Sequence, residues 1–148
     1  MEKLIIGSLG PYLTMNELDD LIASILLDYK GQVVYDFELG KTYEGRSIMG
    51  SAFMLGTSSD NFKRELTDRR SILIDAVHHA RELTTISQTI YTMIALLHGY
   101  EHGNQEFIGI MENAAVIFVP MVNPDGVAYI DEYYSKTGNF EFIRKNRN

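Results

Sequence analysis

Several absences narrow what this 148-residue chain can be. It contains no cysteine, so neither a disulfide framework nor a thiolate metal site is available to it. No stretch approaches the roughly 18 uninterrupted apolar residues of a membrane span, and the apolar part of residues 1–7 is too short for a secretory signal. No cluster of basic residues offsets the formal charge of −7, which argues against nucleic acid as a partner.

The composition is that of a folded chain. Hydrophobic residues make up 45% of the sequence and charged residues 22%, which is enough apolar material for a packed core. The sequence has no break in composition, no internal repeat and no low-complexity segment. We therefore expect one domain or part of one.

Apolar periodicity predicts an alternation of helices and strands. Thr14-Met15-Asn16-Glu17 has the form of a capping box, and the amphipathic helix behind it is expected to stop at Gly31. Two nearly continuous apolar runs are typical of central strands buried on both faces. Helices are expected over residues 15–30, 84–98 and 105–111, strands over 32–38, 48–55, 71–77 and 115–122, and a surface loop with a short helical stretch over 56–70.

The connections between these elements indicate the topology. Residues 40–46 are rich in turn formers and predict an antiparallel hairpin. Gly99 is expected to end the long helix. Asn123-Pro124-Asp125-Gly126 is typical of a turn at the end of a strand. The resulting order predicts a layered α/β domain with a mixed sheet.

His79 and Glu82 stand where the strand over 71–77 ends and the helix from Thr84 begins. In open α/β sheets this carboxyl edge is where ligands and catalytic groups collect. A neutral imidazole and a carboxylate three residues apart can close on one zinc ion. The alternative is structural: a carboxylate that caps a helix beside a hydrogen-bonded histidine. His78 is expected to be a rim residue.

His98 and His102 form a second spaced pair, with Glu101 between them. Their spacing suggests a second metal pair, but Gly99 is expected to interrupt the helix. Histidines near a helix C-terminus also interact favourably with the helix dipole, and this structural reading is preferred.

Four sequence blocks occur in a fixed order along the chain. They are Gly40-Lys41-Thr42-Tyr43-Glu44-Gly45-Arg46, Ile74-Asp75-Ala76 leading into His79-Ala80-Arg81-Glu82, Pro120 to Gly126, and Arg144-Lys145-Asn146-Arg147. Together they resemble the zinc metallocarboxypeptidases of the carboxypeptidase A/B type. One departure is Leu83, where the family usually has tryptophan.

The resemblance implies a role for each matching residue. His79 and Glu82 match the first two ligands of a catalytic Zn²⁺. Arg144 matches the arginine that polarises the scissile carbonyl and also contacts substrate, and Arg81 matches a position near the substrate-binding cleft. A guanidinium suits such roles because it stays charged and donates several hydrogen bonds in one plane. Residues 44–46 and 123–126 match framework elements.

The same resemblance implies that this chain is the N-terminal part, residues 1–148, of a single catalytic domain. The expected fold is a three-layer α/β/α domain with a mixed, largely parallel central sheet, of which the first half is present. The family's second half supplies a third zinc ligand (a histidine), an Asn-Arg pair, a tyrosine and the general-base glutamate. Asn146-Arg147 follows Arg144-Lys145 directly and is not that pair; Arg147 is left as either a solvated charge or a functional residue.

Three functions are compatible with these residues. The first is a zinc carboxypeptidase that hydrolyses the C-terminal bond of peptides or proteins, for which the remainder of the domain is required. Alone, this chain is expected to be inactive and to hold zinc weakly. The second is a zinc amidohydrolase of N-acyl amino acids, which shares the His-x-x-Glu device. The third is a truncated, non-catalytic homologue that acts as a binding module. The resembling family is often secreted or lysosomal.

Overall fold

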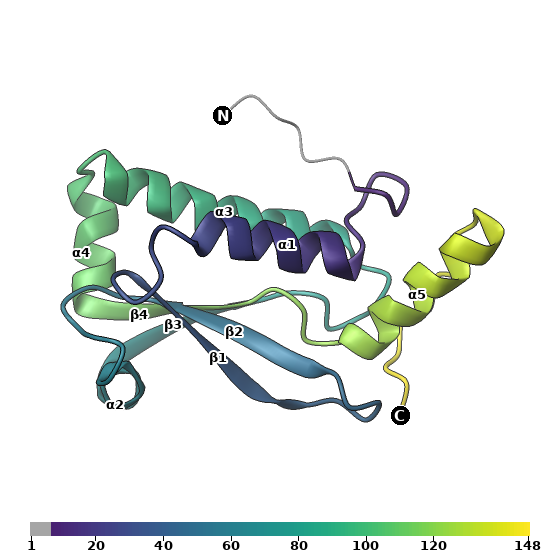
Figure 1. Ribbon diagram of the computed structural model, residues 1–148, viewed down its shortest axis with the longest axis horizontal. Helices are drawn as coiled ribbons and strands as arrows, with labels where there is room; N and C mark the ends of the chain where they lie inside the picture. Colours follow the sequence, from purple (N-terminus) through teal and green to yellow (C-terminus); the bar gives the residue numbers. More distant parts are fainter. Residues whose placement is uncertain (1–6) are drawn as a thin grey trace.

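The chain forms three layers in the computed structural model, which describes residues 7–148 (Figure 1). Helices α1 (Met15–Leu26) and α3 (Thr84–Glu101) lie side by side over one face of a four-stranded sheet. Helix α2 (Phe62–Asp68) packs on the opposite face. The start of the chain, considered above as a secretory signal, lies almost entirely outside the described residues.

The sheet has the strand order β1-β2-β4-β3. Strands β1 (Val34–Lys41) and β2 (Ser47–Phe53) form the predicted antiparallel hairpin, and β2 pairs antiparallel with β4 (Ala114–Val119). Strand β3 (Arg70–Asp75) pairs parallel with β4. The mixed α/β sheet is thus confirmed, with parallel pairing confined to β3 and β4 among these strands. Because β3 and β4 run in the same direction, both end at the same edge of the sheet.

Helix α1 begins at the capping box that the sequence predicts. The Thr14 side chain accepts a hydrogen bond from the Glu17 N–H, and the Glu17 carboxylate accepts one from the Thr14 N–H. The helix ends at Leu26, four residues before the predicted end. After it, the Tyr29 carbonyl accepts three backbone N–H bonds and Gly31 adopts a φ of +77°, so the chain turns back toward β1.

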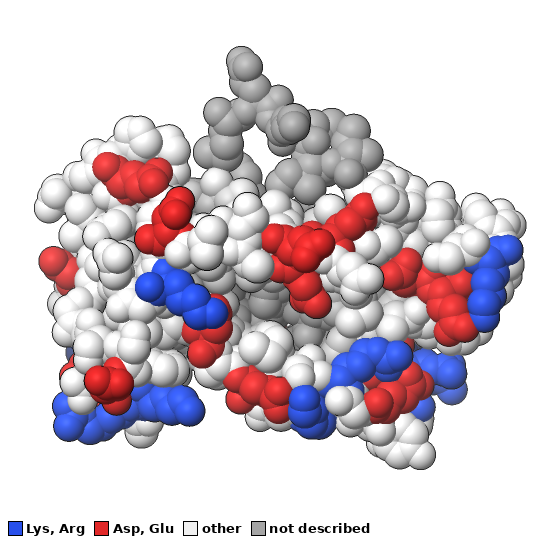
Figure 2. Space-filling model, in the orientation of Figure 1, with Lys and Arg blue, Asp and Glu red and all other residues white. Residues whose placement is uncertain are grey.

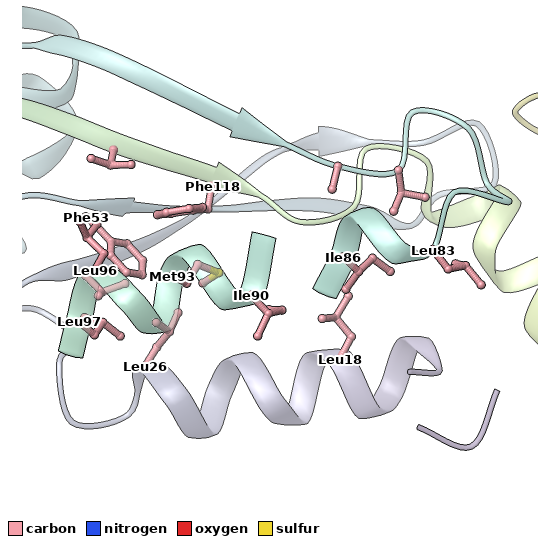
Figure 3. Packing of buried hydrophobic residues seen from close by; sticks show 14 of the residues in the cluster. Leu18, Leu26, Phe53, Leu83, Ile86, Ile90, Met93, Leu96, Leu97 and Phe118 are labelled. Carbon is pink, nitrogen blue, oxygen red and sulfur yellow. The ribbon is translucent and has the colours of Figure 1, made fainter. Parts of the chain in front are cut away.

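The larger core lies between the sheet and the helices α1 and α3 (Figure 3). Leu18 and Leu26 of α1 meet a row of apolar side chains along α3, and the sheet contributes Phe53 and Phe118, whose ring centroids are 4.9 Å apart. Leu83, at the position where the resembling family usually has tryptophan, is buried in the same core. Among the helices of residues 7–148, none combines the length and apolarity needed to cross a bilayer.

The second face of the sheet carries a smaller core beneath α2. Tyr35 of β1 stacks on Phe62 of α2, with ring centroids 5.1 Å apart and an interplanar angle of 14°. Ala52 and Ala115 lie on this face, while their strand neighbours Phe53 and Val116 point to the other. Strands β1, β2 and β4 therefore contribute side chains to both cores, which confirms the three-layer prediction.

The expectation that residues 71–77 form a strand buried on both faces is wrong. Strand β3 lies at the edge of the described sheet, and Ile72 and Leu73 are 46% and 60% exposed. An apolar run without alternation indicates a central strand only if neighbours cover both faces and both sides. Strand β4, flanked by β2 and β3, has those neighbours and is largely buried.

The prediction that α3 ends at Gly99 is also wrong, because the helix continues to Glu101. Gly99 is buried, and a Cβ atom at this position would lie 2.2 Å from the Phe107 ring. Phe107 belongs to α4 (Gln105–Asn113), which lies close to the predicted range. The glycine therefore allows close contact between two helices and does not stop the first one.

Helix α5 (Pro124–Thr137) replaces the isolated turn predicted for residues 123–126. The Asn123 side chain caps it by accepting from the Gly126 N–H at 3.0 Å, and Pro124 occupies the first turn, where its missing N–H costs nothing. Gly138 ends it in the left-handed conformation. The sequence Asn-Pro-Asp-Gly is equally typical of a turn and of a helix start, and only the residues after Gly126 separate the two.

The first turn of α5 is bonded to the connection between β1 and β2 through one carboxylate. The buried Asp125 carboxylate accepts from the Thr42 hydroxyl at 2.7 Å, the Glu44 N–H at 3.0 Å and Arg46 Nη1 at 2.8 Å. Burial by itself raises the pKa of Asp125, but these three donors outweigh burial and lower it. The two blocks that the resemblance assigns to the framework are thus bonded to each other.

Replacing Gly99 by alanine should destabilise the protein by about 1–3 kcal/mol, because the added methyl group overlaps the Phe107 ring. Gly109 lies in α4 with open space around its Cβ position, so Gly109→Ala is the matched control. It should stabilise by up to about 1 kcal/mol through helix propensity. Urea denaturation measures both. Equal effects of the two substitutions would contradict the close-contact role of Gly99.

Asp125→Ala should cost about 2–4 kcal/mol of folding free energy, since it leaves Arg46 and two other donors without their acceptor. The folded-state pKa of Asp125 is depressed, so its contribution is present above the ordinary aspartate pKa. It should be lost as the pH falls through the folded-state pKa. The control is Glu132→Ala, which breaks an exposed pair with Lys136 and should change the folding free energy far less than Asp125→Ala.

Candidate metal centre

The loop after β3 is attached to the loop after β4 through the backbone. The carbonyl of Ala76 accepts from the Val122 N–H at 3.0 Å, and the carbonyl of Val77 accepts from the Asn123 N–H at 3.1 Å. The Asn123 side-chain amide donates to the His78 carbonyl at 3.3 Å. The carboxyl ends of the two parallel strands thus form one rigid platform, and His79 is the next residue along it.

Val77 is strained. Its φ of 55° is the only positive φ of a non-glycine residue among residues 7–148, and a β-branched side chain rarely adopts this conformation. Its N–H donates to Thr85 Oγ1 at 3.1 Å, and that hydroxyl donates to the Glu82 carbonyl at 2.6 Å. These two hydrogen bonds close the loop that contains both candidate ligands, His79 and Glu82. No sequence signal pointed to Val77 or Thr85.

His79 and Glu82 are turned toward each other. The two Glu82 carboxylate oxygens lie 2.9 and 3.0 Å from His79 Nδ1, and the Glu82 N–H donates to the His79 carbonyl at 3.0 Å. The hydrogen bond with His79 lowers the pKa of Glu82; burial opposes this, and the charges of His79, Arg144 and Arg81 add to the lowering. The side chains are 33% and 43% exposed, so a dissolved ion can reach them.

These donors fit part of a zinc site. Imidazole nitrogen and ionised carboxylate are both zinc ligands, and a catalytic zinc takes three protein ligands with one open position. Within the described part of the chain no group of three or more such side chains gathers around one point. His79 and Glu82 would therefore hold the ion together with a ligand that residues 7–148 do not supply.

Two arginines from different segments contribute positive charge at this centre. Arg81, in the turn between the two candidate ligands, borders a cavity of about 200 Å³ that Leu83, Tyr12 and Phe140 also line. Arg144 lies on the extended segment after α5 and is exposed. The positive charges of both arginines lower the pKa of Glu82. Arg144 therefore lies near Glu82 in the fold, although 62 residues separate Arg144 from Glu82 in sequence.

The neighbouring charged residues have other partners. His78 Nε2 lies 3.2 Å from the Asp75 carboxylate, at the rim as expected. Arg147 pairs with Glu44 at 3.2 Å and lies 4.4 Å from the centre of the Tyr129 ring, so it fastens the C-terminal segment to the hairpin and α5. Figure 2 shows acidic and basic side chains interleaved where the hairpin end meets this segment.

Known proteins share both the sequence and the fold. Residues 23–148 match the sequence profile of the zinc carboxypeptidase family. The chain is 35% identical over 91 residues to inactive metallocarboxypeptidase ECM14 of Uncinocarpus reesii, covering 62% of this chain and 15% of that protein. It is 32% identical over 109 residues to a zinc carboxypeptidase of Saccharothrix mutabilis subsp. capreolus, covering 74% of this chain and 23% of that protein.

Two solved structures have the same arrangement of elements. Thrombin-activatable fibrinolysis inhibitor superposes with a TM-score of 0.72 at 19% identity, covering 93% of this chain and 30% of the other. Carboxypeptidase A from Helicoverpa armigera gives 0.62 at 22% identity, covering 95% and 30%. The chain thus spans less than a third of each of these relatives. With the family profile matched over residues 23–148, this chain belongs to the zinc carboxypeptidase family.

Proposed function

We propose that this chain carries the zinc-binding loop and the carbonyl-polarising arginine of a metallocarboxypeptidase, and that the complete catalytic domain acts on peptide or protein C-termini. The observation that carries the proposal is the convergence of His79 Nδ1 and the Glu82 carboxylate within 3.0 Å at the open carboxyl edge of the sheet. Family membership favours this function over an amidohydrolase of N-acyl amino acids.

The residues near the candidate metal centre have different proposed roles. Val77, Thr85 and Asn123 fix the backbone from which the two ligands project, so that little conformational entropy is lost when an ion binds. Arg144 and Arg81 are exposed, and their guanidinium groups can donate hydrogen bonds to a substrate carbonyl or carboxylate. When bound, zinc supplies Lewis-acid chemistry at the scissile carbonyl and lowers the pKa of a water molecule.

The site in this chain is a half-site. Two ligands are present, whereas hydrolysis also requires a third ligand and a general base. We therefore propose that residues 1–148 form the N-terminal part of a single catalytic domain, with the remaining groups contributed by a further part of that domain.

A second candidate is a non-catalytic member of the family that binds peptides or metal without turnover. It is favoured by the name of the Uncinocarpus reesii relative, an inactive metallocarboxypeptidase. The two candidates predict different residues for any further part of the domain. A downstream histidine and glutamate in the family's order favour the enzyme, and their loss favours the binding module.

Zinc titration of this chain tests the ligand pair. Glu82→Gln and His79→Ala should each weaken Zn²⁺ binding at least about tenfold, because each removes one of two ligands. Amide chemical shifts of residues 77–85 report this locally. The matched control is His78→Ala, an adjacent imidazole turned toward Asp75, which should change the affinity less than about twofold. Unaltered binding in Glu82→Gln would refute its assignment as a ligand.

Peptide hydrolysis tests the half-site. Purified residues 1–148 with excess Zn²⁺ should release no amino acid from N-acylated dipeptides that end in phenylalanine or arginine, since no third ligand joins His79 and Glu82 in the described residues. Mass spectrometry of the products after long incubation is the measurement. Turnover that a chelator abolishes, and that Glu82→Gln lacks, would show that the chain is catalytic as it stands.

A further inference from the structure

The end of α3 carries a second pair of imidazole side chains, far from the loop of residues 76–83. His98-Gly99-Tyr100-Glu101-His102 has two histidines four residues apart. Because α3 continues through Gly99, these histidines lie one helical turn apart on the same face. The sequence-based reason for treating them as unrelated, a helix end at Gly99, does not hold. In Figure 1 this turn is at the end of α3 beside α4, away from α5.

The two imidazole rings are stacked on each other, and a hydrogen bond fixes the orientation of the His102 ring. Their centroids are 4.0 Å apart with an interplanar angle of 23°. His102 Nδ1 lies 2.8 Å from the His98 carbonyl. A carbonyl only accepts, so Nδ1 carries the hydrogen and the neutral ring keeps its lone pair on Nε2. A backbone carbonyl that fixes the tautomer in this way is the usual support of a metal-binding histidine.

The surroundings leave the pair open to a cation. Both residues are exposed and border a hollow of about 510 Å³ between α3 and α4, whose other lining residues include Tyr91, Asn104 and Phe107. No lysine or arginine lines this hollow in the described residues. A divalent ion would therefore meet two imidazole nitrogen donors with no lysine or arginine in the described lining of this hollow.

Glu101 does not complete a hydrolytic site. Its carboxylate accepts a hydrogen bond from the Tyr29 hydroxyl, which belongs to the segment between α1 and β1. Burial and this hydrogen bond raise the pKa of Tyr29 to about 12, so the phenol stays protonated and keeps donating. The carboxylate is thus engaged in a structural contact, and the histidine pair is suited to binding and not to activating water.

We propose that His98 and His102 bind one late first-row divalent metal ion through their Nε2 atoms, with water completing the coordination. Imidazole donors suit Cu²⁺, Ni²⁺ and Zn²⁺, and Cu²⁺ is expected to bind most tightly, followed by Ni²⁺. The bound ion cross-links the last turn of α3 and so stabilises the folded chain by mass action. This site is independent of the pair His79 and Glu82.

Copper broadening of NMR signals in the wild-type chain locates the site without any substitution. Substoichiometric Cu²⁺ should broaden the imidazole signals of His98 and His102 and the amide of Gly103 at concentrations that leave most of the chain unaffected. The same pattern should appear in His79→Ala and Glu82→Gln, which separates this site from the other one. Broadening confined to residues 77–85 would overturn the proposal.

Nickel titration of the full chain measures the contribution of each histidine. His98→Ala and His102→Ala should each weaken Ni²⁺ binding at this site at least tenfold and should each abolish the Ni²⁺-dependent rise in melting temperature. Both side chains are exposed, and the spectrum of each ion-free variant verifies its fold. His78→Ala is the control and should retain the rise. Binding within twofold of wild type in both variants would also overturn the proposal.

Discussion

The hydrogen bonds between Asn123 and the backbone of Val77 and His78 hold the candidate zinc loop in place. These hydrogen bonds join the carboxyl ends of β3 and β4, so the sheet restrains the loop. The absence of a side chain at Gly126 completes the junction, because a Cβ there would lie 2.6 Å from the Ala80 Cβ. The first turn of α5 can therefore press directly against the turn that carries the two ligands.

This rigidity accounts for the strain at Val77. A β-branched residue with a φ of 55° persists only where its surroundings over-determine the backbone, and here both its N–H and its carbonyl are bonded. The positive φ turns the chain so that His79 comes next at the open edge of the sheet instead of continuing along β3. The strained backbone at Val77 is thus unfavourable by itself, but it fixes the direction in which the two ligands project.

Local sequence predicted well those features that depend on neighbouring residues. The capping box at Thr14, the hairpin around residues 40–46 and the placement of His79 and Glu82 between a strand and a helix arise from contacts a few residues apart. The failures at β3 and Gly99 have a common cause, since the cover on Ile72 and the need for a glycine at position 99 depend on packing between separate elements. The failure at α5 is different, because the residues after Gly126 decide between a turn and a helix start.

The sequence by itself determined the family and the chemical types at the site: an imidazole, a carboxylate and flanking guanidinium groups. The tertiary structure alone decided which of these meet. In the folded chain, Nδ1 of His79 points toward Glu82, and Arg147 pairs with Glu44. Arg144 lies near enough to Glu82 to lower its pKa, although 62 residues separate the two in sequence. The physical reason is that residue types fix which interactions are possible, whereas the directions of side chains depend on packing and backbone hydrogen bonds between distant segments.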